Sequence, residues 1–260
     1  MLGAIRTADD ARWYRVSVGA LILLAWVVLA AWGASPFRGL MSHRAIGEPG
    51  ASPFVRFLVF VTGWTVMTIA MMLPSSLPLV NLFRRFVSGR PDGGRLTARL
   101  LLGYLAVWTL FGAIAYRADA LVHAVVDQNP ALASRSGWIA AVILLAAGAY
   151  QFTALKHMCL EKCRSPYSFL VERWRSNAAA SDALRLGWRH GLFCLGCCWT
   201  LMLLMFAIGG ANLGWMLVIG AIMAAERTSR WGRYLTRPLG AALVLLGVLH
   251  VARVIVFPAG

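Results

Sequence analysis

Long apolar segments recur along this chain, and they constrain its fold more than any other feature. They lie at about residues 14–32, 54–73, 100–116, 138–155, 191–208, 213–225 and 239–257. An apolar run of about 18 residues or more crosses a bilayer as a helix, because lipid offers no hydrogen-bond partner to an open backbone. The pattern predicts an all-α, polytopic transmembrane bundle of about seven helices, forming a single integral membrane domain over residues 1–260. The sixth segment is short, so a re-entrant segment is the alternative there.

The composition agrees with a membrane environment. Hydrophobic residues make up 60% of the chain and charged residues 13%, and the mean hydropathy is +0.69. A soluble domain is about half apolar and a quarter charged, so the excess apolar surface has to face lipid. The first apolar run is longer than the core of a signal peptide and is followed by further runs, which indicates an uncleaved first helix.

Positive charge follows every second apolar segment. The net charge is +15, but no base-reading motif or aromatic-basic strip is present, and we expect no nucleic-acid partner. Short cytoplasmic loops are enriched in Lys and Arg. This rule predicts a multi-pass protein of the bacterial inner (plasma) membrane, with a cytoplasmic N-terminus and the bilayer as its main partner. The richest early loop carries Arg84, Arg85, Arg90, Arg95 and Arg99.

The five cysteines fall in only two places, and each group lies within a few residues of a histidine. The charge pattern predicts both groups at the cytoplasmic ends of the fourth and fifth helices. Residues three or four apart share one face of a helix, so the thiols and imidazoles are expected to converge. The candidate metal ligands are Cys159, Cys163, Cys194, Cys197, Cys198, His157 and His190.

This ligand set suits a soft or borderline metal ion. Thiolates and thioethers favour Cu(I), Zn(II) and iron–sulfur centres, and zinc sites use four Cys or His ligands. We therefore predict bound copper or zinc. Methionines at helical spacing and one acidic residue are second-rank candidates, namely Met67, Met71, Met72, Met202 and Glu226. Packing is the alternative explanation for the buried sulfur residues.

The predicted function is metal handling or transport by an integral membrane protein, rather than an enzyme. One alternative is a membrane thiol–disulfide oxidoreductase, for which Cys194 and Cys197 have a usable spacing. Another is an accessory membrane subunit with structural cysteines. The chain contains no nucleotide-binding loop and no Asp-Lys-Thr-Gly phosphorylation motif, which argues against a primary pump.

Three motifs carry a resemblance to a known family. They are Trp64-x-x-Met67-x-x-x-Met71-Met72-x-Pro74, Lys156-x-x-Cys159-x-x-x-Cys163 and Cys194-x-Gly196-Cys197-Cys198-Trp199. Over about Phe54 to Ala225 the chain resembles a bacterial family of predicted metal-binding integral membrane proteins of unknown function. The resemblance implies a helical membrane fold and metal binding, without a reaction. Glu226 matches an acidic position of that family, and Arg227 stands where a lysine is expected.

Overall fold

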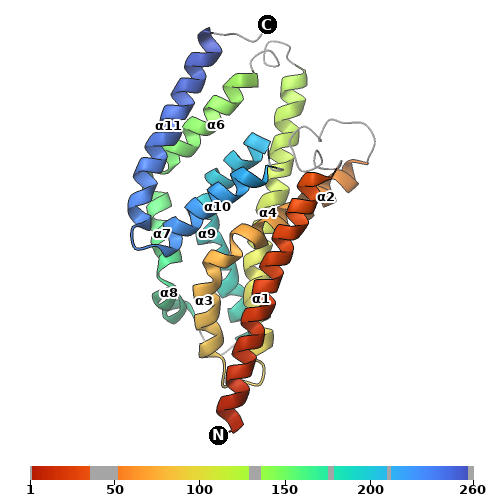
Figure 1. Ribbon diagram of the computed structural model, residues 1–260, viewed down its shortest axis with the longest axis vertical. Helices are drawn as coiled ribbons and strands as arrows, with labels where there is room; N and C mark the ends of the chain where they lie inside the picture. Colours follow the sequence, from red (N-terminus) through yellow and green to blue (C-terminus); the bar gives the residue numbers. More distant parts are fainter. Residues whose placement is uncertain (1, 36–51, 129–135, 175–178, 210–211, 257–260) are drawn as a thin grey trace.

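The computed structural model describes residues 2–35, 52–128, 136–174, 179–209 and 212–256. These parts are helical and contain no strand, which confirms the all-α prediction for them. The first turn of α1 and the last turn of α11 lie at opposite ends of an elongated bundle (Figure 1). The helices are α1 (Leu2–Ala34), α2 (Pro53–Met71), α3 (Leu73–Phe86), α4 (Gly93–Asp127), α6 (Ser136–Tyr150), α7 (Ala154–Arg164), α8 (Pro166–Arg173), α9 (Ala179–Gly209), α10 (Leu213–Thr228) and α11 (Gly232–Val256).

Five helical segments are long and apolar enough to cross a membrane. They are Val16–Ala34, Pro53–Met71, Gly93–Val126, Ala179–Met205 and Gly232–Val256. The two other predicted spans fall on α6, with 15 residues, and α10, with 16 residues. Both are shorter than the roughly 20 residues that span a bilayer. The number of seven spans therefore stays a prediction, whereas five candidate spans are present.

The second predicted span breaks at Met72, between α2 and α3. Pro74 causes the break, because proline lacks an N–H group and its ring clashes with the carbonyl four residues earlier. The Met72 amide still donates to the Thr68 carbonyl at 2.8 Å, and the Ser75 hydroxyl donates to the Met72 carbonyl at 2.9 Å. The broken backbone is thus satisfied, and the Met72 side chain at the break is fully buried.

The fourth predicted span also ends earlier than the apolar pattern suggests. Helix α6 stops at Tyr150, and the chain turns before Thr153 caps the new helix α7. The Thr153 hydroxyl accepts a hydrogen bond from the Lys156 amide at 3.3 Å, as an N-cap does. Cys159 and Cys163 consequently lie one turn apart on α7, which confirms that their spacing is helical.

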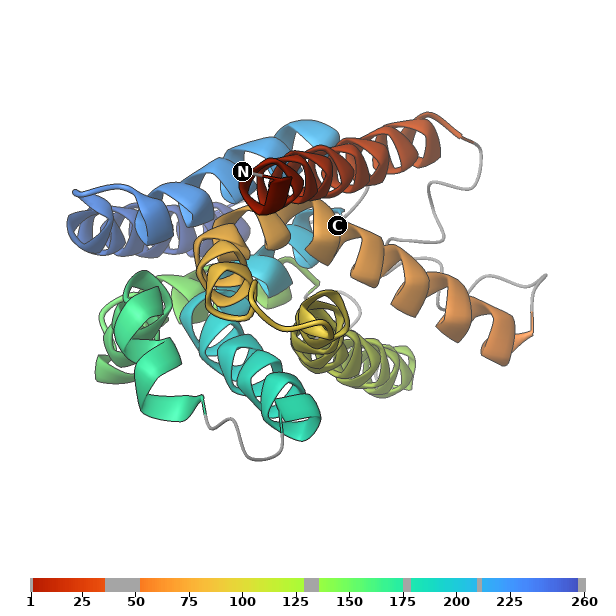
Figure 2. The same cartoon turned by 90° about the horizontal axis from the view of Figure 1, so that it is seen from below.

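Helix α9 begins far earlier than predicted. The apolar pattern predicts the fifth helix over about residues 191–208, and this start is wrong for the helix, because α9 starts at Ala179. Gly187 lies in this additional stretch of helix, and a Cβ atom there would collide with the Leu100 carbonyl of α4. Small residues of this kind let two helix backbones come close, so α4 and α9 lie side by side along this stretch (Figure 2).

The bundle has two separate cores. The larger one, which we name the sulfur core, lies where α2, α7, α9 and α10 meet, and its sulfur residues are Met67, Met71, Met72, Met202, Met205, Met216, Met223, Cys159, Cys194, Cys197 and Cys198. The smaller one, the sulfur-free core, joins α3, α4, α8 and α9, and its members are Leu79, Val80, Phe83, Val87, Leu96, Leu100, Phe169, Leu170, Ala183 and Leu186.

Candidate metal site

The three cysteines of α9 lie on one stripe of the helix and are buried. The Cys197 and Cys198 sulfurs lie 3.1 and 2.9 Å from the Cys194 carbonyl, one turn back. The cysteine sulfurs of α9 contact different partners on the neighbouring helices. The Cys194 sulfur is 3.1 Å from the Tyr104 hydroxyl of α4, and the Cys198 sulfur is 3.6 Å from the Met72 sulfur. The break at Pro74 therefore brings a thioether from α2–α3 to a thiol on α9.

Cys163 brings α7 to the same place. Its thiol hydrogen-bonds to the Cys197 sulfur, and it is the only one of the five cysteines that is half-buried rather than buried. This hydrogen bond, together with burial, holds the pKa of Cys163 well above its ordinary value. Without a metal ion the Cys163 thiol is therefore protonated, and a bound metal would have to displace that proton.

Cys159 lies one turn before Cys163 and packs against the backbone of α9. A Cβ atom at Gly196 would be 2.5 Å from the Cys159 sulfur, so glycine makes room for this thiol. The Tyr150 hydroxyl donates to the Gly196 carbonyl and ties the end of α6 to the same turn. Burial, followed by the nearby Cys197, raises the pKa of Cys159. The missing side chain of Gly196 thus leaves space in which the Cys159 thiol packs against α9.

The two predicted histidines have different surroundings from the thiols. His190 is buried between rings, with centroids 5.5 Å from Tyr104 and 5.7 Å from Phe169, and neither ring nitrogen has a hydrogen-bond partner. His157 is half-buried on α7, and the adjacent Met158 is 51% exposed. Within the described residues, no three or more His, Cys, Asp or Glu side chains gather as ligands for one ion. The sulfurs that do meet form two pairs. The Cys163 thiol contacts the Cys197 thiol, and the Cys198 thiol contacts the Met72 thioether.

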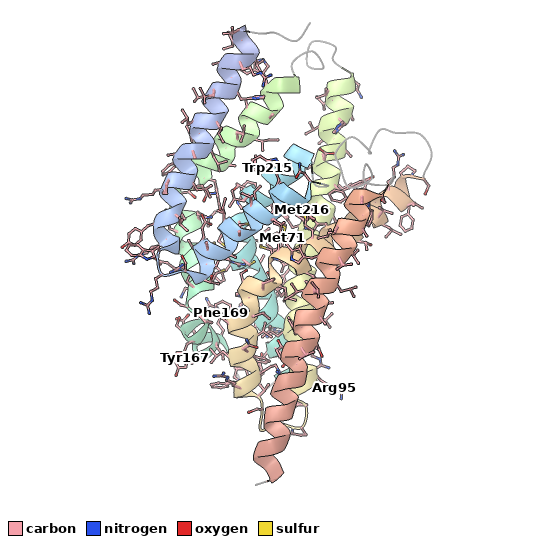
Figure 3. The ribbon with its side chains drawn as sticks, in the orientation of Figure 1. Met71, Arg95, Tyr167, Phe169, Trp215 and Met216 are labelled. Atoms are coloured by element: carbon pink, nitrogen blue, oxygen red, sulfur yellow. The ribbon has the colours of Figure 1, made fainter. Side chains whose placement is uncertain are left out.

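The predicted methionines all lie in the sulfur core. Met67, Met71, Met72 and Met202 are at most 4% exposed. Figure 3 shows Met71 and Met216 in the middle of the bundle, and the Met71 side chain lies against Gly220 of α10. Buried thioethers from α2, α9 and α10 therefore continue from the thiols into the bundle.

Glu226, a second-rank candidate ligand, is paired with a lysine. The Lys156 ammonium lies 2.7 Å from a Glu226 carboxylate oxygen, and both side chains are at most 2% exposed. Arg164 donates to the backbone carbonyls of Glu226 and Ser229, which anchors the end of α10 to α7. The Lys-x-x-Cys spacing hinted at this role of Lys156 only by placing a cation one turn before Cys159, and sequence reasoning missed the pair.

Arg227 was noted in the sequence only as a residue that stands where a lysine is expected, and its role in the site was missed. Its guanidinium is buried in the sulfur core, where it donates to the Ser75 hydroxyl and lies 3.5 Å from the Cys163 sulfur and 3.9 Å from the Met72 sulfur. An arginine beside a helix end reads as an interfacial residue in the sequence. Only its position beside Glu226, at the end of an apolar segment, could have drawn attention to it.

A helical bundle whose core collects thiols and thioethers is suited to holding a soft metal ion. The model of the PpoB2 family, described as a copper chaperone, matches residues 61–250, and the chain belongs to this family. This match confirms the prediction, made from the motifs, that the chain belongs to a metal-related family. It supports copper as the metal and gives no support to zinc. No curated protein and no solved structure matches the chain.

Proposed function

We propose that this protein is a membrane-embedded copper chaperone that holds Cu(I) between α7, α9 and the α2–α3 break. The observation that carries the proposal is the meeting of the Cys198 and Met72 sulfurs at 3.6 Å, beside the hydrogen-bonded pair of Cys163 and Cys197. As part of the same proposal, residues 1–260 form one domain in the inner membrane with a cytoplasmic N-terminus, which puts this cluster toward the cytoplasmic side.

The donor set favours Cu(I) over other metals. Cu(I) is soft, prefers thiolate and thioether ligands, and is satisfied by few of them. Zinc sites usually need four Cys or His ligands, and in the described part of the chain no three such groups converge. We assign the ion first to the thiol pair of Cys163 and Cys197 together with Met72, and Cys198, which contacts Met72, is the nearest further thiol. Cys159 and Cys194 follow as neighbours, and His157 and His190 are outer candidates.

A chaperone must also release its cargo, and Cys163 is suited to that step. It is half-buried while the other four thiols are buried, so an incoming ligand reaches it first. A partner thiol or thioether could bind Cu(I) beside Cys163 and then displace the deeper ligands one at a time. Stepwise ligand exchange keeps the ion bound throughout, which is the chemical task of a metal chaperone.

Passage of Cu(I) through the bundle is a second candidate function, which the buried methionines favour. Along α9, the stripe continues from Cys194 and Cys198 to Met202 and Met205. At 1.5 Å per residue, Cys194 and Met205 are about 16 Å apart along the helix axis, roughly half of the ~30 Å hydrocarbon core. Thioethers are neutral and bind Cu(I) without losing a proton, whereas thiolates hold it more strongly. This increase in affinity from thioethers to thiolates would lead the ion toward the thiols.

Copper content of the purified full-length protein tests the chaperone proposal. We expect near-stoichiometric copper after anaerobic loading with Cu(I), with sulfur ligands in X-ray absorption spectra. The variant C163S/C198S should lose it, and the matched control M158L, which changes an exposed sulfur on the same helix, should retain it. Copper that persists in C163S/C198S would place the site elsewhere. A protein without copper but with a titratable disulfide would favour thiol exchange.

Uptake of Cu(I) into proteoliposomes tests passage. The variant M205L/M216L should slow uptake while leaving the copper content of the loaded protein unchanged, because leucine preserves volume but removes the thioether. The control M158L should take up copper at the wild-type rate. Equal uptake by M205L/M216L and wild type would reduce the methionines to packing residues and leave the chaperone proposal intact.

A further inference from the structure

The guanidinium of Arg227 lies inside the candidate copper site, not at its edge. The side chain comes from the end of α10, and the residue is only 6% exposed. One terminal nitrogen donates to Ser75 and lies 3.9 Å from the Met72 sulfur, and the other lies 3.5 Å from the Cys163 sulfur. The same two sulfur residues are assigned above as ligands, so a positive charge is built into the site.

No described carboxylate forms an ion pair with this charge. The adjacent Glu226 is paired with the buried Lys156 at 2.7 Å, and these two charges cancel each other. The groups that contact Arg227 are a hydroxyl, a thioether and a thiol, and its Nε atom is buried without a partner. Arginine does not lose its proton in proteins, and a buried unpaired cation is costly.

The charge of the bound metal decides whether this cost is relieved. A Cu(I) ion held by two thiolates forms a complex with a net charge of −1, which balances the charge of Arg227. A Zn(II) ion held by the same two thiolates forms a neutral complex, and Arg227 stays unbalanced. A third thiolate would restore the balance for Zn(II), but within the described residues no three His, Cys, Asp or Glu side chains gather around one point.

We infer that Arg227 makes the site selective for a monovalent metal ion, Cu(I), over divalent ions, by balancing the charge of a dithiolate complex. The inference rests on the proposed copper site and adds a selectivity determinant to it. Softness alone cannot supply this selection, because thiolates also bind soft divalent ions such as Cd(II). Charge balance in a buried site can, because the surrounding protein screens an unbalanced charge poorly.

Competition between Cu(I) and Zn(II) for the purified full-length protein in detergent, under anaerobic reducing conditions, tests the inference. Truncating one partner of a buried charge pair costs affinity strongly, so R227Q should lower the ratio of Cu(I) to Zn(II) affinity by about tenfold or more. R227K keeps the charge and should stay within about threefold of wild type. R230Q removes an exposed charge three residues away, in the turn after α10, and should have no effect.

A second pair of ions separates charge from softness and needs no variant. Ag(I) and Cd(II) are both soft, but thiolates bind Ag(I) more tightly in any case, so the reference is a small dithiol such as dithiothreitol. The ratio of Ag(I) to Cd(II) affinity should be larger for wild-type protein than for this dithiol if charge balance operates. This comparison decides the matter if R227Q does not fold. A ratio of Ag(I) to Cd(II) affinity no larger than that of dithiothreitol, or an unchanged Cu(I)-to-Zn(II) ratio in folded R227Q, would overturn the role of Arg227 alone. Wild-type protein that binds no Cu(I) at all would overturn the proposed function and this inference together.

Discussion

The sulfur core and the sulfur-free core are built from the same helix α9 and yet differ in chemistry. The N-terminal half of α9 contributes Ala183 and Leu186 to a core made only of hydrocarbon side chains. The C-terminal half of α9 contributes Cys194, Cys198 and Met202 to a core that also encloses charged groups. The change occurs within about three helical turns, since each turn takes 3.6 residues.

The difference between the two cores separates stability from function. Hydrocarbon side chains such as Phe83 and Leu100 pack without leaving polar atoms unpaired. The sulfur core instead borders buried polar atoms that lack partners, including Glu226 Oε1 and Arg227 Nε. Such atoms are destabilising unless something else compensates them. A core that keeps them is better explained by a ligand than by packing.

Truncation in the sulfur-free core should give the largest effect, and on stability alone. Phe83 is fully buried and meets the Trp174 ring edge-on at a centroid distance of 4.9 Å. The variant F83A should lower the free energy of unfolding by about 3–5 kcal/mol, because it leaves a cavity. Copper bound per folded molecule should not change, with F83L as the milder control. Loss of copper from folded F83A would show that the two cores are coupled.

Removal of one thiol from the sulfur core should instead lower the affinity for Cu(I) and leave the stability almost unchanged. Losing an outer-shell partner typically weakens metal binding by about 10–100-fold, so C197S, which removes a proposed ligand, should weaken Cu(I) binding by at least about 100-fold. Serine is nearly isosteric, and the melting temperature of the metal-free protein should change little. The measurement is competition with a Cu(I) chelator, beside a melting curve. Wild-type affinity in C197S would exclude this thiol from the site.

The thioether at the helix break should matter less than a thiolate. The variant M72L conserves side-chain volume, so its stability cost should stay below about 1.5 kcal/mol. Cu(I) affinity should fall by about tenfold, equivalent to about 1.4 kcal/mol. X-ray absorption should report fewer sulfur ligands around copper. An unchanged sulfur shell would mean that Met72 packs against Cys198 without binding the ion.

Cys159 provides the smallest and sharpest test within the sulfur core. It faces Gly196, whereas Cys163 on the same helix faces Cys197 and Arg227. We expect C159A to weaken Cu(I) binding by less than about tenfold, below the range for loss of an outer-shell partner, because Cys159 packs against the Gly196 backbone. The paired variant C163A should weaken it far more. Equal losses in C159A and C163A would show that both thiols bind the ion.

Sequence patterns predicted the helices better than their junctions. The apolar runs placed the five candidate membrane segments, and the i,i+4 spacing of Cys159 and Cys163 predicted their shared turn on α7. Proline chemistry accounts for the break after Met71. The early start of α9 at Ala179 was not predicted, because the charged residues before His190 resemble a loop. In this stretch Gly187 packs closely against the α4 backbone, a tertiary contact that local sequence patterns do not encode.

The sequence by itself determined the all-helical fold, the enrichment of soft ligands and the spacing that puts Cys194, Cys197 and Cys198 on one face, because each follows from local periodicity and side-chain chemistry. The tertiary structure alone decided which sulfurs meet. Met72 reaches Cys198 from 126 residues away, and Arg227 reaches Cys163 from 64 residues away. Contacts over such separations depend on how whole helices pack. The charge at the centre of the sulfur core therefore became visible only in the folded protein.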